Sequence, residues 1–104
     1  MKGENPIGQI LEIDRLIHEP SRLAILTILF GVKEADFNFI LRMSGLTRGN
    51  LSSHLSKLED AGYLEVKKGF IGKIPNTVYR LSKKGRKSYE SYIKKMEEII
   101  KKRK

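Results

Sequence analysis

The sequence predicts a small α+β domain, mostly helical, in which a helix-turn-helix precedes a two-stranded hairpin and a long C-terminal helix. Two observations predict it. Apolar residues recur at helical spacing before residue 62 and after residue 84, and they alternate with polar residues in between. With 104 residues, the chain can bury one modest core. We therefore expect residues 1–104 to form a single domain.

Two helices are expected before the helix-turn-helix. Residues 21–30 are apolar on almost every side, which predicts a buried central helix that ends at Gly31. Pro20 suits the first turn of this helix and ends the one before it. That earlier helix, of about ten residues, is predicted by apolar residues at helical spacing: Ile7, Ile10, Leu11, Leu16 and Ile17.

A helix-turn-helix is expected over about residues 36–61. Asp36 is a candidate N-cap for a short third helix, and Gly45 can take the positive φ of a tight turn. Thr47 is the candidate N-cap of a fourth helix, which closes at Gly62.

A hairpin is expected over about residues 63–82. Its predicted strands are residues 63–70 and 77–82, and residues 71–76 form the connecting tip. A final helix is expected over about residues 84–103. A helix-turn-helix followed directly by such a hairpin has the topology of a winged helix.

The fourth helix has two faces. Leu51, Leu55 and Leu58 form an inward stripe, and acidic residues appear only at the end, at Glu59 and Asp60. Small polar side chains on the outer face allow close approach to a DNA major groove, where hydroxyls bond base edges or phosphates. The residues expected to contact DNA from this helix are Thr47, Arg48, Gly49, Asn50, Ser52, Ser53, Ser56 and Lys57.

Five positions of this helix leave alternatives open. Arg48 contacts a phosphate or a guanine edge, or it is only a solvated arginine. Gly49 avoids the DNA backbone or merely eases packing. His54, beside the leucine stripe, is expected to be half-buried and bonded to backbone, with a phosphate contact or a metal ligand as alternatives. Ser53 and Ser56 serve DNA binding or are simply small exposed residues.

Further cations lie on the hairpin and at the start of the last helix. Lys73 is expected to reach phosphate or an adjacent minor groove, supported by Lys68 and Arg80. Lys67 and Lys68 alternatively protect a strand edge. A second group of cations lies at the start of the last helix, where positive charge is unfavourable next to the helix dipole. These cations have a phosphate partner, or they only form a solvated face. They are Lys83, Lys84, Arg86 and Lys87.

The last helix carries an apolar stripe that we expect to be too long for its own domain to cover. Such a stripe marks a partner surface. We expect a twofold dimer, with the alternative that the helix folds back on its own chain. The expected interface residues are Ile7, Ile10, Leu11, Tyr89, Tyr92, Ile93, Met96, Ile99 and Ile100.

The charge is high and uneven. The net charge is +9, divided into −1 for residues 1–46, +3 for residues 47–82 and +7 for residues 83–104. It indicates a polyanionic partner, although a lysine-rich surface adapted to heat is an alternative. There is no cysteine, apolar run of membrane length or signal-peptide pattern, so we expect a cytoplasmic protein without disulfides.

The stretch from His18 to Leu81 resembles the winged-helix regulators of bacteria and archaea, between the arsenic-repressor-like and multiple-antibiotic-resistance-repressor-like groups. HEPSRLAILTIL is similar to an early core helix, LTRGNLSSHLSKLEDAGYLEV to a recognition helix and first wing strand, and GKIPNTVYRLSKKGR to the closing wing. The resemblance implies a homodimer with the recognition helix in the major groove and the wing beside the minor groove. The metal-sensing branch carries cysteines or terminal-helix histidines, which this chain lacks, so no metal or other cofactor is expected.

The sequence therefore predicts a sequence-specific regulator that binds double-stranded DNA as a homodimer and represses by blocking polymerase. A protein-interaction module without DNA readout is the alternative. Neither a catalytic triad nor a phosphate-binding loop is present, so no enzyme activity is expected. Any small-molecule effector is left unidentified.

Overall fold

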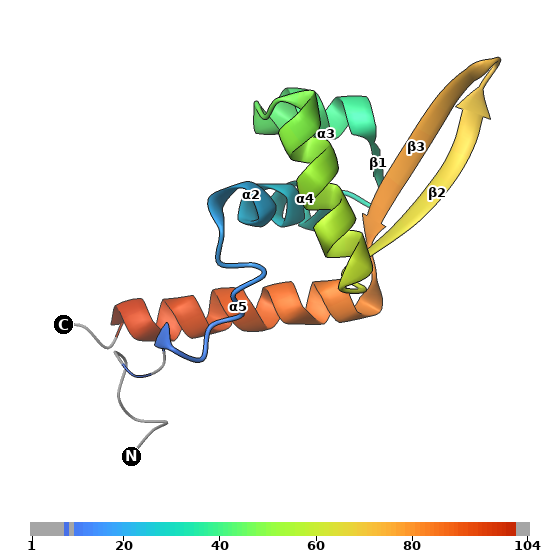
Figure 1. Cartoon of the computed structure of the whole chain (residues 1–104). Coiled ribbons are helices and arrows are strands. Elements are labelled where there is room, and N and C mark those ends of the chain that lie inside the picture. Colours follow the sequence, from blue (N-terminus) through green and yellow to red (C-terminus); the bar gives the residue numbers. More distant parts are fainter. Residues whose placement is uncertain (1–7, 9, 102–104) are drawn as a thin grey trace.

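The computed structural model describes residues 8 and 10–101, and it confirms the winged-helix topology from residue 20 onward (Figure 1). No helix in this part of the chain is long and apolar enough to cross a membrane. In chain order, the elements are α2 (Pro20–Phe30), β1 (Ala35–Asp36), α3 (Phe37–Ser44), α4 (Arg48–Asp60), β2 (Leu64–Ile71), β3 (Ile74–Leu81) and α5 (Lys83–Lys101).

The first helix is predicted to include Leu11, Leu16 and Ile17, but of the residues described before α2 only 8 and 10 are helical. Residues 11–19 form turns and bends. Asp14 accounts for the difference, because its Oδ1 accepts the backbone N–H groups of Leu16 and Ile17. Such local bonds compete with the helical ladder. Ile17 is nevertheless fully buried, so the apolar spacing reports burial here rather than a helix.

α2 is the central core helix, as predicted. It starts at Pro20, and the Glu19 carboxylate caps it by accepting the Arg22 N–H at 2.7 Å. Gly31 ends it. Its buried residues are Ile25, Leu26 and Leu29.

The predicted helix-turn-helix is also present. Asp36 caps α3 through the Phe39 N–H, and Gly45 follows with a φ of +73°. The side chain of Thr47 caps α4 by accepting the Asn50 N–H at 3.2 Å. The turn therefore fixes the direction of α4 with the residues that the sequence singled out.

The hairpin has a longer second strand and a tighter turn than predicted. β2 and β3 pair antiparallel along their whole length, up to a closing pair of Ile71 and Ile74. The predicted connection of residues 71–76 is wrong, because Gly72–Lys73 alone joins the strands. Gly72 makes this possible: its φ of +62° suits the first central position of a type II′ turn.

β1 is a strand that the sequence analysis missed. It adds to the free edge of β3, where Ala35 pairs with Tyr79 and Asp36 with Val78, and it completes a sheet in the order β1-β3-β2. Two residues are too few to show an alternating pattern.

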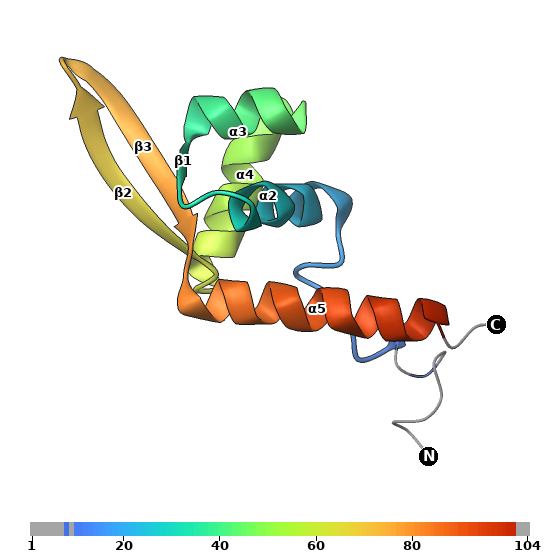
Figure 2. The same cartoon turned by 180° about the vertical axis from the view of Figure 1, so that it is seen from behind.

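α5 begins immediately after the hairpin and runs beneath α2 (Figure 2). The joint is tight, because a Cβ on Gly85 would lie 2.1 Å from the carbonyl oxygen of Tyr63. The Ser82 hydroxyl accepts the Gly85 N–H at 2.9 Å and donates to the Gly62 carbonyl at 2.5 Å. These contacts set the direction of α5 relative to the hairpin.

Candidate nucleic-acid interface

α4 has the two faces that the sequence predicts. Leu51, Leu55 and Leu58 are buried in the core. The residues predicted to contact DNA are all exposed: Thr47, Arg48, Gly49, Asn50, Ser52, Ser53, Ser56 and Lys57.

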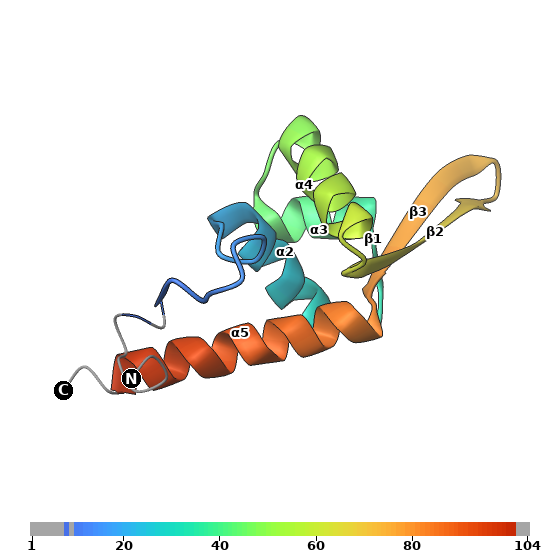
Figure 3. The ribbon, with the colours of Figure 1, turned by 60° about the horizontal axis from the view of Figure 1, so that its bottom comes forward.

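The start of α4 and the tip of the hairpin lie on the same side of the molecule. In Figure 1, α4 descends from α3 toward the start of α5, and the hairpin rises away from that same region. The view in Figure 3 agrees: both elements project away from α5. An extended ligand on this side can therefore meet the first turns of α4 and the hairpin together.

Gly49 is open to its surroundings. A Cβ built there would meet no atom within 4 Å. Glycine costs a helix roughly 1 kcal/mol relative to alanine, so its place in α4 needs a reason. No described residue packs closely enough against Gly49 to require a glycine there. The open space therefore favours the close approach of an external ligand.

Arg48 is exposed but held in position. Its Nη2 donates to Asn38 Oδ1 at 3.4 Å, and its guanidinium lies 5.7 Å from the centre of the Phe37 ring. Both partners are on α3. The guanidinium keeps further N–H donors that neither contact uses.

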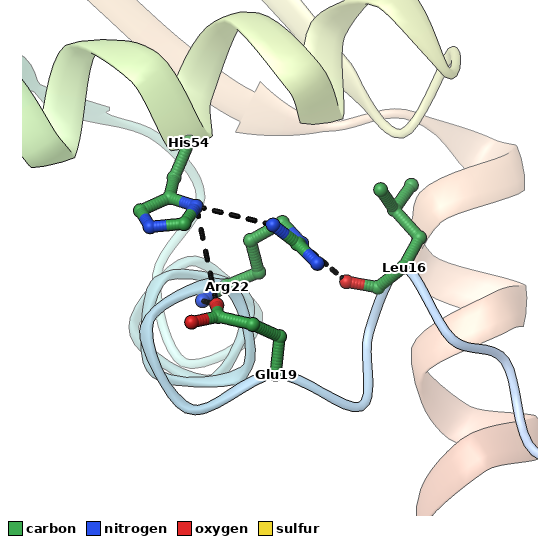
Figure 4. Close-up of polar contacts among 4 residues, drawn as sticks. All are labelled: Leu16, Glu19, Arg22 and His54. Atoms are coloured by element: carbon green, nitrogen blue, oxygen red, sulfur yellow. Dashed lines mark hydrogen bonds and ion pairs between the residues drawn. The ribbon is translucent and has the colours of Figure 1, made fainter.

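His54 is half-buried, as expected, but its partners are side chains rather than backbone. Its Nδ1 lies 3.2 Å from Arg22 Nη1 and 3.9 Å from Glu19 Oε1 (Figure 4). A guanidinium can only donate, so the neutral ring with its proton on Nε2 fits this contact. Arg22 also donates from Nε to the Leu16 carbonyl at 2.6 Å. His54 thus fixes α4 to the start of α2.

The Glu19 carboxyl in this cluster favours its charged form. Burial by itself raises its pKa, but the backbone N–H groups of Arg22 and Ser21, together with the positive charge of Arg22, bring the pKa below its ordinary value. The cap of α2 is therefore a carboxylate at neutral pH.

The hairpin cations do not form one surface. Lys67, Lys68 and Lys73 are exposed. Arg80 instead pairs with Glu65 across the strands, with 2.6 Å between Nε and Oε1. In the register of the sheet, Arg80 and Lys68 also lie on opposite faces. The predicted set of Lys73, Lys68 and Arg80 is therefore divided: within the described residues Arg80 is in an ion pair, whereas Lys68 and Lys73 are not.

Two cations at the start of α5 have structural partners that neither sequence alternative named. Lys84 Nζ donates to the Ala61 carbonyl at 2.8 Å, so it neutralises the C-terminal end of α4. The Arg86 guanidinium lies 4.8 Å from the centre of the Phe30 ring. Lys83 and Lys87 are exposed.

The apolar stripe of α5 is largely covered by its own chain, contrary to expectation. Tyr89, Tyr92 and Ile99 are buried, while Ile93 and Met96 are partly buried. The tyrosine hydroxyls also have partners: Tyr89 meets Thr27 Oγ1 at 2.9 Å, and Tyr92 meets His18 Nδ1 at 2.7 Å. Of the other predicted interface residues, Ile10, Leu11 and Ile100 are exposed, and Ile7 lies outside the described residues.

The sequence analysis missed an apolar surface at the tip of the hairpin. Phe70, Ile71 and Ile74 are 71%, 64% and 71% exposed. The available signal was an apolar residue on each side of Gly72–Lys73, within a stretch predicted to be a loop. Within the described residues, no group of three or more histidine or acidic side chains is arranged to hold a metal.

A family model described as a winged helix DNA-binding domain matches residues 21–100. An uncharacterized protein of Methanocaldococcus jannaschii is 35% identical over 79 residues, which are 76% of this chain and 86% of that protein. The solved structure of a transcriptional regulator homologue from Pyrococcus horikoshii has a TM-score of 0.82 at 27% identity and covers 92% of this chain and 94% of its own.

More distant structures show the fold alone. A regulator of the multiple-antibiotic-resistance-repressor family from Silicibacter pomeroyi has a TM-score of 0.65 at 19% identity. It covers 96% of this chain, which spans 66% of that regulator. These similarities confirm the resemblance that the sequence motifs indicate.

Proposed function

Since the chain belongs to the winged helix DNA-binding domain family, we propose that it is a transcriptional regulator that binds specific double-stranded DNA sequences as a homodimer. One observation carries the proposal: the outer face of α4 is exposed, small and polar, with open space at Gly49. Such a face lets a helix backbone approach base edges in the major groove. Repression follows where the bound protein blocks polymerase.

The readout is proposed to be divided between α4 and the hairpin. Arg48, Asn50, Ser52, Ser53 and Ser56 face the major groove. Lys57, Lys68 and Lys73 neutralise phosphates. In a twofold dimer, two α4 helices would read half-sites roughly 34 Å apart.

We propose that the homodimer forms through the apolar side chains that remain exposed on α5 and on the segment before α2. Ile10, Leu11 and Ile100 are exposed, and Ile93 borders a shallow groove beside Phe30 and Tyr89. We expect Leu11→Ser with Ile100→Ser to reduce the sedimenting mass from two chains to one. Met43→Ser is the matched control, because Met43 is similarly exposed on α3.

The test is selection from random-sequence duplexes, followed by affinity titration at several salt concentrations. We expect a pseudo-palindromic operator and a linear fall of log affinity with log salt. Arg48→Ala should weaken operator binding about tenfold or more. Lys101→Ala removes the same charge from the far end of α5 and should change affinity little. Absence of duplex binding at moderate salt, with capture of a protein partner instead, would favour the interaction-module alternative.

A further inference from the structure

We propose that the tip of the hairpin is an apolar wedge that enters a widened minor groove and bends the operator. The wedge consists of Phe70, Ile71, Ile74 and Pro75. This inference rests on the proposed function. It adds a preference for deformable DNA at the base step that the tip meets, where the protein makes no base-specific contact.

The wedge is apolar on both of its faces. Phe70 pairs with Pro75 and Ile71 with Ile74, and neighbouring pairs of a hairpin point to opposite faces. All four residues are exposed. A protein partner docked on one face would leave the other apolar face in water. A groove covers both faces at once, because it has a wall on each side.

The wedge is too small to hold a protein partner by itself. A stable protein interface takes roughly 800 Å² from each partner, supplied by about 20–30 residues. Here four residues and a two-residue turn project alone from the body of the molecule (Figure 1). If the tip inserts into DNA, α4 supplies most of the contacts, so the tip does not need to bury the area of a protein interface.

The charge around the wedge fits a polyanion. Residues 66–79 contain Lys67, Lys68 and Lys73 and no acidic residue. Lys68 shares a face with Phe70, and Lys67 shares the opposite face with Ile71. Each apolar face thus has a cation below it, at the level where phosphates border a groove. A second copy of this tip would meet the same three positive charges and be repelled.

The physical consequence is deformation of the duplex. An ordinary minor groove is only about 6 Å wide, so a two-stranded ribbon with side chains must open it. Apolar side chains that press between base steps partly unstack them and kink DNA by about 20–90° toward the major groove. Pyrimidine–purine steps unstack most easily. The selected operators should therefore carry such a step where the tip meets the DNA.

The experiment combines protein and DNA variants on the selected operator. Bending is measured by energy transfer between labelled duplex ends, and unstacking by 2-aminopurine placed at the flexible step. Wild-type protein should bend the duplex and lose about tenfold in affinity when the step is replaced by a stiff A-tract. F70T/I71T/I74T should straighten the complex and lose that step preference, while its salt dependence is unchanged. Threonine keeps the strand propensity of the hairpin.

Lys73→Ala provides the complementary variant from the same turn. It should reduce the slope of log affinity against log salt by about one and keep both bend and step preference. Phe70→Thr alone, a milder change, should reduce bending in the same direction as the triple variant.

Each contrary outcome is distinguishable. Tight operator binding without a bend, or a bend that survives F70T/I71T/I74T, would overturn the wedge and leave the proposed function standing. A change in sedimenting mass with an unchanged bend would assign the tip to contacts between copies and overturn the wedge. No binding to any duplex would overturn the proposed function together with the wedge.

Discussion

The two ends of the hairpin are made of similar residues and have opposite environments. At the base, Leu64 pairs with Leu81, and both are buried against the helices. At the tip, Ile71 pairs with Ile74, and both are exposed. Apolar strand residues therefore serve two purposes in one element: those at the base stabilise the fold, and those at the tip are available to another molecule.

The joint of the base with α5 should respond most strongly to substitution. Gly85→Ala places a Cβ only 2.1 Å from the Tyr63 carbonyl oxygen. Neither atom can move away by a side-chain rotation, because the oxygen belongs to the backbone and the Cβ is attached to it. Backbone must shift, so we expect a loss of about 3 kcal/mol in the free energy of unfolding. Urea denaturation followed by circular dichroism measures it. A urea midpoint equal to that of the wild type would show that the joint accommodates the added methyl group.

Threonine in place of an apolar residue at each end of β2 separates the roles of the two ends directly. Leu64→Thr removes a buried side chain and should lower the free energy of unfolding by about 2 kcal/mol. Ile71→Thr alters an exposed position and should change it by less than about 0.5 kcal/mol. Thermal melts of both variants make the comparison. Equal losses would mean that the tip contributes to folding as the base does.

Tyr63, at the base of the hairpin, makes the stability of the fold depend on pH. Burial, and then the hydrogen bond that its hydroxyl donates to Asp14, raise the pKa of Tyr63 above its ordinary value. A raised pKa stabilises the fold below pH 10, and this contribution is lost as the pH rises through the folded-state pKa.

Tyr63→Phe tests this dependence. It should cost about 1 kcal/mol at neutral pH through the lost hydrogen bond and reduce the fall in stability above pH 10. Tyr79 and Tyr92 also have raised pKa values, mainly through burial, so part of the alkaline fall should persist. An unchanged alkaline profile would exclude Tyr63 as a contributor.

Features encoded by short, local patterns could be predicted from the sequence. The caps Asp36 and Thr47, the turn at Gly45 and the stripe of α4 depend on residues within one or two turns of each other. Gly72 is an equally local signal, but the basic and proline-containing tip was interpreted as loop. The two apolar residues that flank Gly72–Lys73 then gave no indication of an exposed surface.

Features that depend on distant contacts could not be predicted. β1 exists only because β3 offers a free edge. The cover over Tyr89 and Tyr92 comes from Thr27 and His18, which lie more than 60 residues away in the chain. For Lys84 the sequence leaves a phosphate contact and a solvated face open, because the Ala61 carbonyl cannot be located from sequence. The charge pattern therefore indicates a polyanionic partner but does not assign the role of each cation.

The same substitution at two glycines should change stability in opposite directions, and at Gly49 it also tests DNA binding. Gly49→Ala fills open space in the first turn of α4, whereas Gly85→Ala meets backbone. The free energy of unfolding should rise by up to about 1 kcal/mol, because alanine favours helix. Operator affinity should nevertheless fall, since the added methyl occupies the space that close approach to DNA requires. Calorimetry and operator titration of this one variant separate the two effects. A gain in stability with full affinity would remove Gly49 from the DNA-facing surface and place the contact farther along α4.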